Sequence, residues 1–310
     1  MRIIVLKLVA ALAPAIICAS VAGTAETVES PVENVTVNGR RVADEEIHAF
    51  VTARTAPTFK LGKVARWEKG ICPTVMGLKS DFTDFVTKRL KETAAKVGAP
   101  LDPDAHCAPD IQIVFTTTPQ GLMDNIRKSF DPLLGYHDNS SQAEAMAKVT
   151  HVIQAWYSTV TLDVRGVPRF DGGNIPGIGC VDPPKCHINL PRAQAYAVTG
   201  DRVSDGLRSG FHDVIIVIDP TKLRGYEIGA LADYITFLAL TQPLSLDDCQ
   251  QMPSILNLLA KKCAAADDTH EMSESDIGYL KGVYHMKDDG TLATQQNEIA
   301  YQVKQTLLGR

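Results

Sequence analysis

Two carboxylates on one apolar segment, residues 226–240, are the side chains best placed to do chemistry in this sequence. Glu227 lies at the start of the segment, and Asp233 follows six residues later. A glutamate beside a metal ion can take a proton from bound water, but at a helix start it more often satisfies the helix dipole. A carboxylate inside an apolar helix must be paired, because an isolated buried charge is costly.

Helical spacing places four residues on one face of this segment: Tyr226, Ala230, Asp233 and Phe237. We expect Asp233 to be buried on that face. In one interpretation it is a structural anchor that hydrogen-bonds to the loop around Ser254 and Asn257. In the other it is a ligand of a metal ion. The anchor is the favoured interpretation, because most buried polar groups are hydrogen-bonded within the protein.

Six cysteines follow the first 25 residues and form the second group with chemical potential. An even number of cysteines in an exported chain predicts disulfides. We expect sequential pairing, because each pair then brackets one helix, turn or loop: Cys72 with Cys107, Cys180 with Cys186, and Cys249 with Cys263. Zinc or thiolate chemistry at Cys186-His187 is the alternative. No Cys-x-x-Cys spacing supports it, so the disulfide interpretation is preferred.

Other catalytic signatures are missing from the sequence. Eight histidines are dispersed along the chain, and no two of them are four residues apart. The spacings of a nucleophile elbow, a Ser-x-x-Lys motif and a phosphate-binding glycine loop do not occur. These absences disfavour the common serine hydrolases and nucleotide-dependent enzymes.

The beginning of the chain and its charge indicate the compartment. Residues 1–25 have the charged start, apolar run and small residues of a signal peptide, and the apolar run is shorter than the ~20 residues that cross a bilayer. We therefore expect a periplasmic or secreted protein with no membrane span. The formal charge is −5 and there is no Lys/Arg run, which argues against nucleic-acid binding.

Strands alternate with helices along the remaining chain, which is typical of the α/β and α+β classes. Periodicity and caps predict helices over residues 80–98, 119–130, 142–149 and 226–240, and strands over 111–116, 153–164 and 214–218. Ser80 and Ser141 are the expected caps of the first and third helices. No repeat or linker divides the chain, so we expect one domain over 61–310 after a flexible leader over 26–60.

The segment 226–240 also resembles the buried helix of zincin peptidases of the metzincin kind. Tyr226-Glu227-Ile228-Gly229-Ala230 stands where these peptidases carry His-Glu-x-x-His. A second similarity is to the turn that carries the metzincin methionine, which corresponds to Pro253-Ser254-Ile255-Leu256-Asn257. Leu256 stands where that methionine is expected. Residues 273–284 are similar to the closing helix of matrixin-like chains. The resemblance spans roughly residues 67–286 and implies a mixed sheet packed on a buried central helix.

The resemblance implies a metal site that has lost its ligands. Tyr226, Ala230 and Thr236 occupy the three histidine positions, and none of them has an imidazole. We therefore assign no catalytic residue and expect neither a metal nor a cofactor. The degenerate cleft would be formed by Tyr226, Glu227, Ala230, Asp233 and Asn257.

These features predict an exported, non-catalytic bacterial protein that binds a peptide, a protein or another envelope ligand in this cleft. A metal-dependent hydrolase is an alternative, with unorthodox ligands drawn from Asp233, Glu227 and a distant histidine. A disulfide-stapled structural protein is a further alternative. Stoichiometric zinc that Asp233→Ala abolishes would favour the hydrolase.

Overall fold

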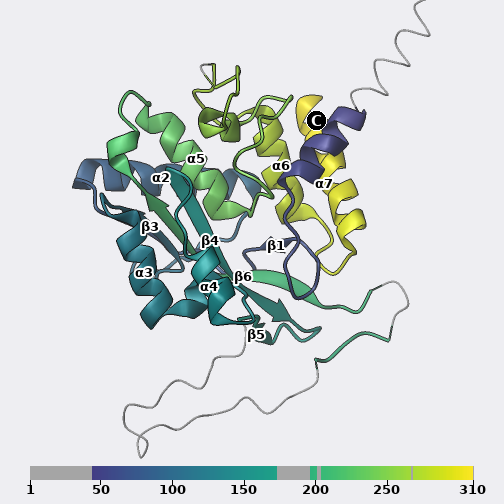
Figure 1. Cartoon of the computed structure of the whole chain (residues 1–310). Coiled ribbons are helices and arrows are strands. Elements are labelled where there is room, and N and C mark those ends of the chain that lie inside the picture. Colours follow the sequence, from purple (N-terminus) through teal and green to yellow (C-terminus); the bar gives the residue numbers. More distant parts are fainter. Residues whose placement is uncertain (1–43, 173–195, 201–203, 267, 310) are drawn as a thin grey trace, which may run out of the picture. The chain divides into compact units, whose positions relative to one another are not determined.

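Six strands form one mixed sheet in the computed structural model, which describes residues 44–172, 196–200, 204–266 and 268–309 (Figure 1). The strands are β1 (Ala65–Arg66), β2 (Pro73–Met76), β3 (Ile111–Phe115), β4 (Ile153–Leu162), β5 (Pro168–Phe170) and β6 (Arg208–Ile218). Helices alternate with them along the chain. The protein is therefore a mixed α/β protein, as its sequence pattern predicts.

The sheet has the order β2-β3-β6-β4-β5, and β1 pairs with the first residues of β6. β2, β3 and β6 run parallel, with Ile111 opposite Val214 and Phe115 opposite Ile218. β4 lies antiparallel to β6, and β5 is antiparallel to β4. The long apolar β6 therefore lies in the middle of the sheet. The predicted strand 214–218 is only its second half.

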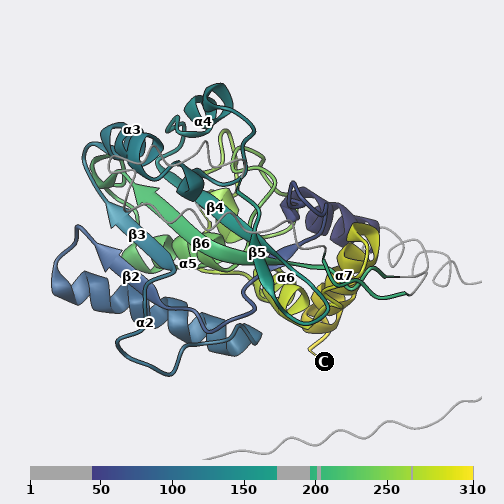
Figure 2. The same ribbon diagram turned by 90° about the horizontal axis from the view of Figure 1, so that it is seen from below.

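Both faces of the sheet are covered by helices (Figure 2). Val214, Ile216 and Ile218 of β6 belong to the larger core, which also contains buried residues of α2 (Ser80–Val97) and α5 (Ile228–Leu240). Ile215 and Val217 point to the other face, where they meet buried residues of α3 (Pro119–Ser129) and α4 (Ser140–Met146). A strand that is buried on both faces needs apolar residues at successive positions, which explains its composition.

Helix α2 lies where the apolar periodicity predicts it. Val86, Leu90, Ala94 and Val97 form its buried stripe, and Gly98 ends the helix with a φ of 84°, a conformation that glycine adopts without strain. The predicted cap is displaced by one residue, because Lys79 is the N-cap and its side chain does not bond to the helix.

The boundaries of the other expected elements are close to the prediction. The predicted helix 119–130 corresponds to α3, and the predicted strand 153–164 corresponds to β4. The helix expected over 142–149 is α4, which starts earlier because Asn139, rather than Ser141, is its N-cap and accepts a hydrogen bond from the Gln142 amide.

Helix α5 is the central apolar helix of the larger core. It follows β6 through a short 3-10 helix, Pro220–Lys222, whose N-cap Asp219 accepts a hydrogen bond from the Thr221 amide. Every residue from Ala230 to Leu240 is buried. The helix packs on α2 and on the sheet, so its apolar surface is enclosed on all sides, as its sequence requires.

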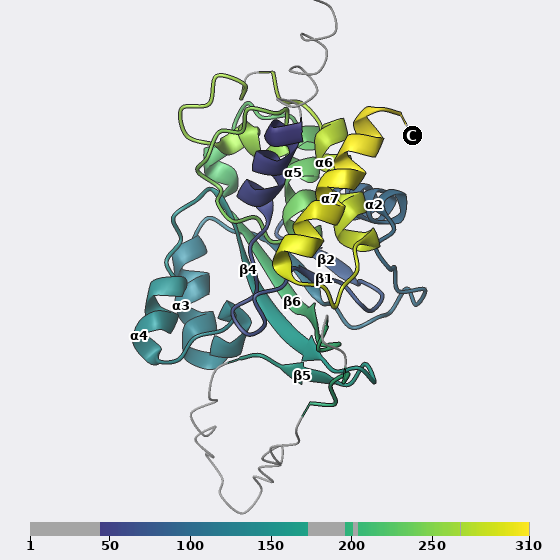
Figure 3. The ribbon, with the colours of Figure 1, turned by 90° about the vertical axis from the view of Figure 1, so that its right-hand side faces the viewer.

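Two antiparallel helices, α6 (Glu274–His285) and α7 (Leu292–Leu307), lie side by side beyond α5 (Figure 3). Ser273 and Asp276 form a capping box at the start of α6, and the predicted segment 273–284 is therefore helical. Helix α7 was not among the expected elements. The two helices approach closely at Gly282, where an added Cβ would lie 2.7 Å from the Ile299 Cα.

A helix over residues 44–54 packs against this pair (Figure 3). Ile47, Phe50 and Val51 contribute to the larger core, and Asp44 forms an ion pair of 2.7 Å with Lys304 of α7. Residues from Asp44 onward belong to the compact unit that contains the sheet. Residues 44–60 of the segment expected to be a flexible leader are thus part of the folded unit, because their apolar residues recur at helical spacing and find a partner surface.

This helix ends with a buried arginine. Arg54 is completely buried, and its guanidinium lies 3.7 Å from the centre of the Phe50 ring. The Nε atom is 3.9 Å from the Asp276 carboxylate, and none of the three guanidinium nitrogens hydrogen-bonds to the described part of the chain. Burial lowers the pKa of Arg54 to about 10.

Two of the three predicted disulfides are confirmed, Cys72–Cys107 and Cys249–Cys263. The third predicted pair, Cys180 with Cys186, lies outside the described residues, as do the expected signal peptide and the remainder of the leader before residue 44. Within the described ranges, none of the helices combines the length and apolarity that a bilayer crossing requires.

Candidate functional site

A hollow of about 340 Å³ opens beside the start of α5, and we call it the α5 hollow. Its lining comes from the loop before α5, from the first turn of that helix and from the segment 258–270. The residues that line it are Arg224, Gly225, Tyr226, Glu227, Ala230, Leu258, Ala266, Thr269 and His270. Polar and apolar surfaces are both present, as is common in small-ligand sites.

The sheet positions the first wall of this hollow. The chain leaves β6 at its carboxyl end, passes through the 3-10 helix and reaches Gly225, whose φ is 94°. Such a positive φ is favourable only for glycine, and it turns the chain into α5. Loops at the carboxyl ends of strands are the usual ligand-binding loops of open α/β sheets. The α5 hollow therefore lies beside a loop of that kind.

The start of α5 has no side-chain cap. Glu227 is the N-cap residue, and its carboxylate does not accept a hydrogen bond from the first turn. The first amides of a helix have no partner inside the helix. At Gly229 an added Cβ would meet no atom within 4 Å, so the helix surface there is open.

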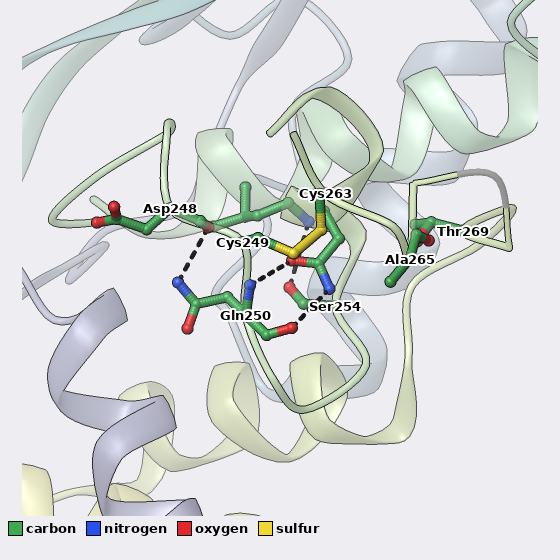
Figure 4. The surroundings of a disulfide bond; sticks show 9 residues. Asp248, Cys249, Gln250, Ser254, Cys263, Ala265 and Thr269 are labelled. Atoms are coloured by element: carbon green, nitrogen blue, oxygen red, sulfur yellow. Dashed lines mark hydrogen bonds between the residues drawn. A yellow bond between two sulfur atoms is a disulfide. The ribbon is translucent and has the colours of Figure 1, made fainter. Parts of the chain in front are cut away.

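The second wall adjoins a loop that is closed by a disulfide (Figure 4). The Cys249–Cys263 bond ties its ends, and the Gln250 amide donates to the Asn257 side-chain oxygen at 2.8 Å. The Asn257 amide group donates in return to the Gln250 carbonyl oxygen at 3.2 Å. Beyond the disulfide, the Thr269 hydroxyl donates to the Ala265 carbonyl oxygen. These bonds help to hold the segment that faces α5 in place.

Asp233 is buried and paired, as expected, but it does not line the hollow. Its two oxygens accept from the Nε and Nη2 atoms of Arg89 on α2, at 2.6 and 2.9 Å. The Met272 amide donates a third hydrogen bond, of 2.8 Å. The pair raises the pKa of Arg89, chiefly through this hydrogen bonding. Asp233 thus ties α5 to α2 and to the entry of α6, instead of to Ser254 and Asn257.

The loop around Ser254 has another buried carboxylate as its partner. The Ser254 hydroxyl donates to Asp276 of α6 at 2.7 Å, and the Ile255 amide donates to the same carboxylate at 2.7 Å. Asn257 is buried against Gln250. Of the five residues expected to form the cleft, Tyr226, Glu227 and Ala230 line the α5 hollow, whereas Asp233 and Asn257 do not.

Sequence reasoning missed three residues of this region that have ionisable side chains. Arg224 and His270 line the α5 hollow, and Arg89 binds Asp233. Arg224 lies two residues before the segment Tyr226–Ala230, so its position beside that segment could have identified it as a candidate lining residue. Nothing local marks Arg89 or His270, because Asp233 and the start of α5, near which they lie, are distant from them in sequence.

The ligands of the alternative hydrolase are not gathered at one place. In the described ranges, no three side chains of His, Cys, Asp or Glu come together as a metal ion would require. Glu227 and His270 share the α5 hollow, but the Asp233 carboxylate is occupied by Arg89 and the Met272 amide.

Comparison with known proteins identifies no relative of this chain. No protein-family model matches the chain, and neither a curated protein nor a solved structure matches it. Its function must therefore be inferred from its own geometry.

Proposed function

We propose that this protein is an exported, non-catalytic binding protein that holds a short peptide, or a peptide-bearing envelope ligand, in the α5 hollow. The observation that carries this proposal is the hollow itself. It lies at an uncapped helix start, it is lined by three residues of the expected cleft, and it combines charged with apolar groups. Its volume of about 340 Å³ is within the range of roughly 300–1,000 Å³ of small-ligand sites.

The non-catalytic part of the proposal depends on residue chemistry. Tyr226 and Ala230 take the positions at which the resemblance to zincins requires imidazoles, and Asp233 is engaged by Arg89. A mixed sheet above the buried α5 agrees with a zincin-like scaffold, which we retain as part of the proposal. Glu227 alone would be a base without a metal-bound water to act on.

Export is supported by the cysteines and by the start of the chain. Two disulfides form between cysteines of the folded unit, and disulfides persist mainly in oxidising compartments. The residue pattern of 1–25 is that of a signal peptide.

A titration with a random hexapeptide pool, monitored by amide NMR, tests the proposal. We expect shifts of the Gly225 and Gly229 amides, which lie at the hollow and at the open start of α5. The variant Ala266→Trp should fill the hollow and suppress these shifts, because Ala266 is a lining residue. Ala264→Trp is the matched control, since Ala264 is exposed in the same loop and does not line the hollow. Absence of shifts at saturating pool concentration would contradict the proposal.

A further inference from the structure

Two opposite charges face the α5 hollow without pairing with each other. Arg224 and Glu227 both line it and both are exposed. Neither side chain forms an ion pair or hydrogen bond with the described part of the chain. The two residues are only three positions apart, with the turn at Gly225 between them. Both charges are therefore available to a ligand.

This availability contrasts with charged residues elsewhere in the folded unit. Lys63 is bonded to Asp205 at 2.7 Å, Arg66 to Glu68 at 2.7 Å, and Arg165 to Asp163 at 2.8 Å. Arginine and lysine side chains that have a carboxylate within reach thus commonly pair with it in this protein. Arg224 and Glu227 share a concave surface and do not.

The remaining lining limits the size and polarity of a ligand. Ala230 and Leu258 are buried apolar lining residues, while Tyr226 is 42% exposed. The volume of about 340 Å³ is near the lower end of the range for small-ligand sites, so the occupant must be short. A guanidinium and a carboxylate that line one small hollow are complementary to a molecule that carries both a negative and a positive group.

We infer that the ligand of the α5 hollow is a dipolar short peptide with both termini free. Its carboxylate binds Arg224, its ammonium group binds Glu227, and a small or aliphatic side chain rests on Ala230 and Leu258. This inference depends on the proposed function and specifies the ligand class of the same site. A guanidinium suits the first contact, because it can donate two parallel hydrogen bonds to a carboxylate.

Four pools of random tripeptides test the inference: unblocked, N-acetylated, C-amidated and blocked at both ends. We expect the unblocked pool to shift the Gly225 and Gly229 amides, and each block to weaken binding by about tenfold or more, since a charge-assisted hydrogen bond is lost. Arg224→Gln should remove the sensitivity to C-amidation, and Glu227→Gln should remove the sensitivity to N-acetylation. Lys222→Gln is the control for charge, because Lys222 pairs with Asp219 and does not line the hollow.

The outcomes separate the inference from the proposed function. Equal binding of all four tripeptide pools overturns the dipolar ligand and leaves peptide binding intact. Binding of the hexapeptide pool without binding of any tripeptide pool also overturns the inference alone. If neither kind of pool shifts the two amides, both the inference and the proposed function are wrong.

Discussion

Asp233 illustrates how one buried carboxylate joins three elements. It lies on α5, binds the guanidinium of Arg89 on α2 through both oxygens, and accepts the Met272 amide just before α6. The Asp233 side chain is 1% exposed and that of Arg89 is 40% exposed, so the carboxylate depends on its partners more than the guanidinium does. Removal of the carboxylate therefore affects packing between helices before it affects any ligand.

We expect Asp233→Ala to lower the free energy of unfolding by about 2–3 kcal/mol in metal-free buffer, because the Met272 amide loses its acceptor and the helices lose an ion pair. Urea denaturation measures this loss. Asp84→Ala on the exposed side of α2 is the control and should change stability by less than about 0.5 kcal/mol. Unchanged stability of Asp233→Ala, together with loss of a metal-dependent activity, would favour the ligand role instead.

The two members of the buried Arg54–Asp276 pair should respond differently to substitution. Asp276 accepts hydrogen bonds from Ser254, Ile255 and Ser273, whereas the Arg54 guanidinium has no acceptor among the described residues. We expect Asp276→Asn to cost about 3–5 kcal/mol, since it leaves a buried cation unpaired. Arg54→Met should cost less, because the carboxylate that remains keeps its hydrogen bonds from Ser254, Ile255 and Ser273. Chemical denaturation of both variants checks the asymmetry. A larger loss for Arg54→Met would contradict it.

A surface histidine gives the fold a pH-dependent contribution. His212 hydrogen-bonds through Nδ1 to Asp213, which raises the pKa of His212, while burial and Lys69 oppose the rise and Asp110 supports it. The protonated form is thus favoured in the folded state. Its stabilising effect is complete below the unfolded-state pKa of about 6.5 and is lost as the pH rises through the higher folded-state pKa.

We therefore expect the stability difference between the wild type and His212→Gln to be largest near pH 5 and to vanish in alkaline solution. The effect should stay below about 1 kcal/mol, because the pair is partly exposed and screened by water. Unfolding free energies measured between pH 5 and pH 9 test this sign. A difference that grows with pH would show that the charged imidazole is not favoured by folding.

At the scale of elements, the glycines distinguish a tight helix interface from an open helix start. An added Cβ at Gly282 would lie 2.7 Å from the Ile299 Cα and 3.1 Å from its carbonyl oxygen, which are backbone atoms of α7. At Gly229 on α5 the same atom would meet nothing within 4 Å. The α6–α7 contact therefore requires glycine, whereas the start of α5 does not.

Gly282→Ala should destabilise the protein by about 1–3 kcal/mol, because the two helices must move apart. Gly229→Ala should stabilise it by up to about 1 kcal/mol, since alanine restricts the unfolded chain and fits the helix. Thermal denaturation of the two single variants, each compared with the wild type, measures both changes. Equal effects of the same sign would contradict this difference between the sites.

At the scale of the whole molecule, the two disulfides in the described part of the chain have different effects. Cys249–Cys263 closes a short loop with a sequence separation of 14, and this loop adjoins the second wall of the α5 hollow. Cys72–Cys107 has a separation of 35 and joins the start of β2 to the segment before β3, away from the lining residues. Only the first disulfide is expected to influence ligand binding directly.

Replacing both Cys249 and Cys263 by serine should lower stability by up to about 3 kcal/mol and also weaken binding of the hexapeptide pool. The double serine variant of Cys72 and Cys107 should lower stability by a similar amount or more, because the loop is longer, while the affinity stays unchanged. Denaturation and peptide titration of both variants provide the comparison. Equal losses of affinity would show that the Cys249–Cys263 disulfide influences the hollow no more than the Cys72–Cys107 disulfide does.

Local patterns in the sequence were sufficient for much of the secondary structure. The apolar stripe of α2, the alternation of β3 and the continuous apolarity of α5 each follow from how a segment buries its side chains, so each is visible in a short window. The two described disulfides could also be predicted, because their cysteines are consecutive along the chain. Helix 44–54 carried the same kind of signal, at Ile47, Phe50 and Val51.

The sequence alone determined the mixed α/β class, the apolar central helix, two pairs of consecutive cysteines and the absence of histidine at Tyr226, Ala230 and Thr236. Only the tertiary structure decided that Asp233 binds Arg89, that Asp276 accepts a hydrogen bond from Ser254, and that His270 and Glu227 line the same hollow. These pairs are separated by tens of residues or more, and their proximity depends on how helices cross and pack on the sheet. Side-chain pairing over such separations is a property of packing, which no local pattern encodes.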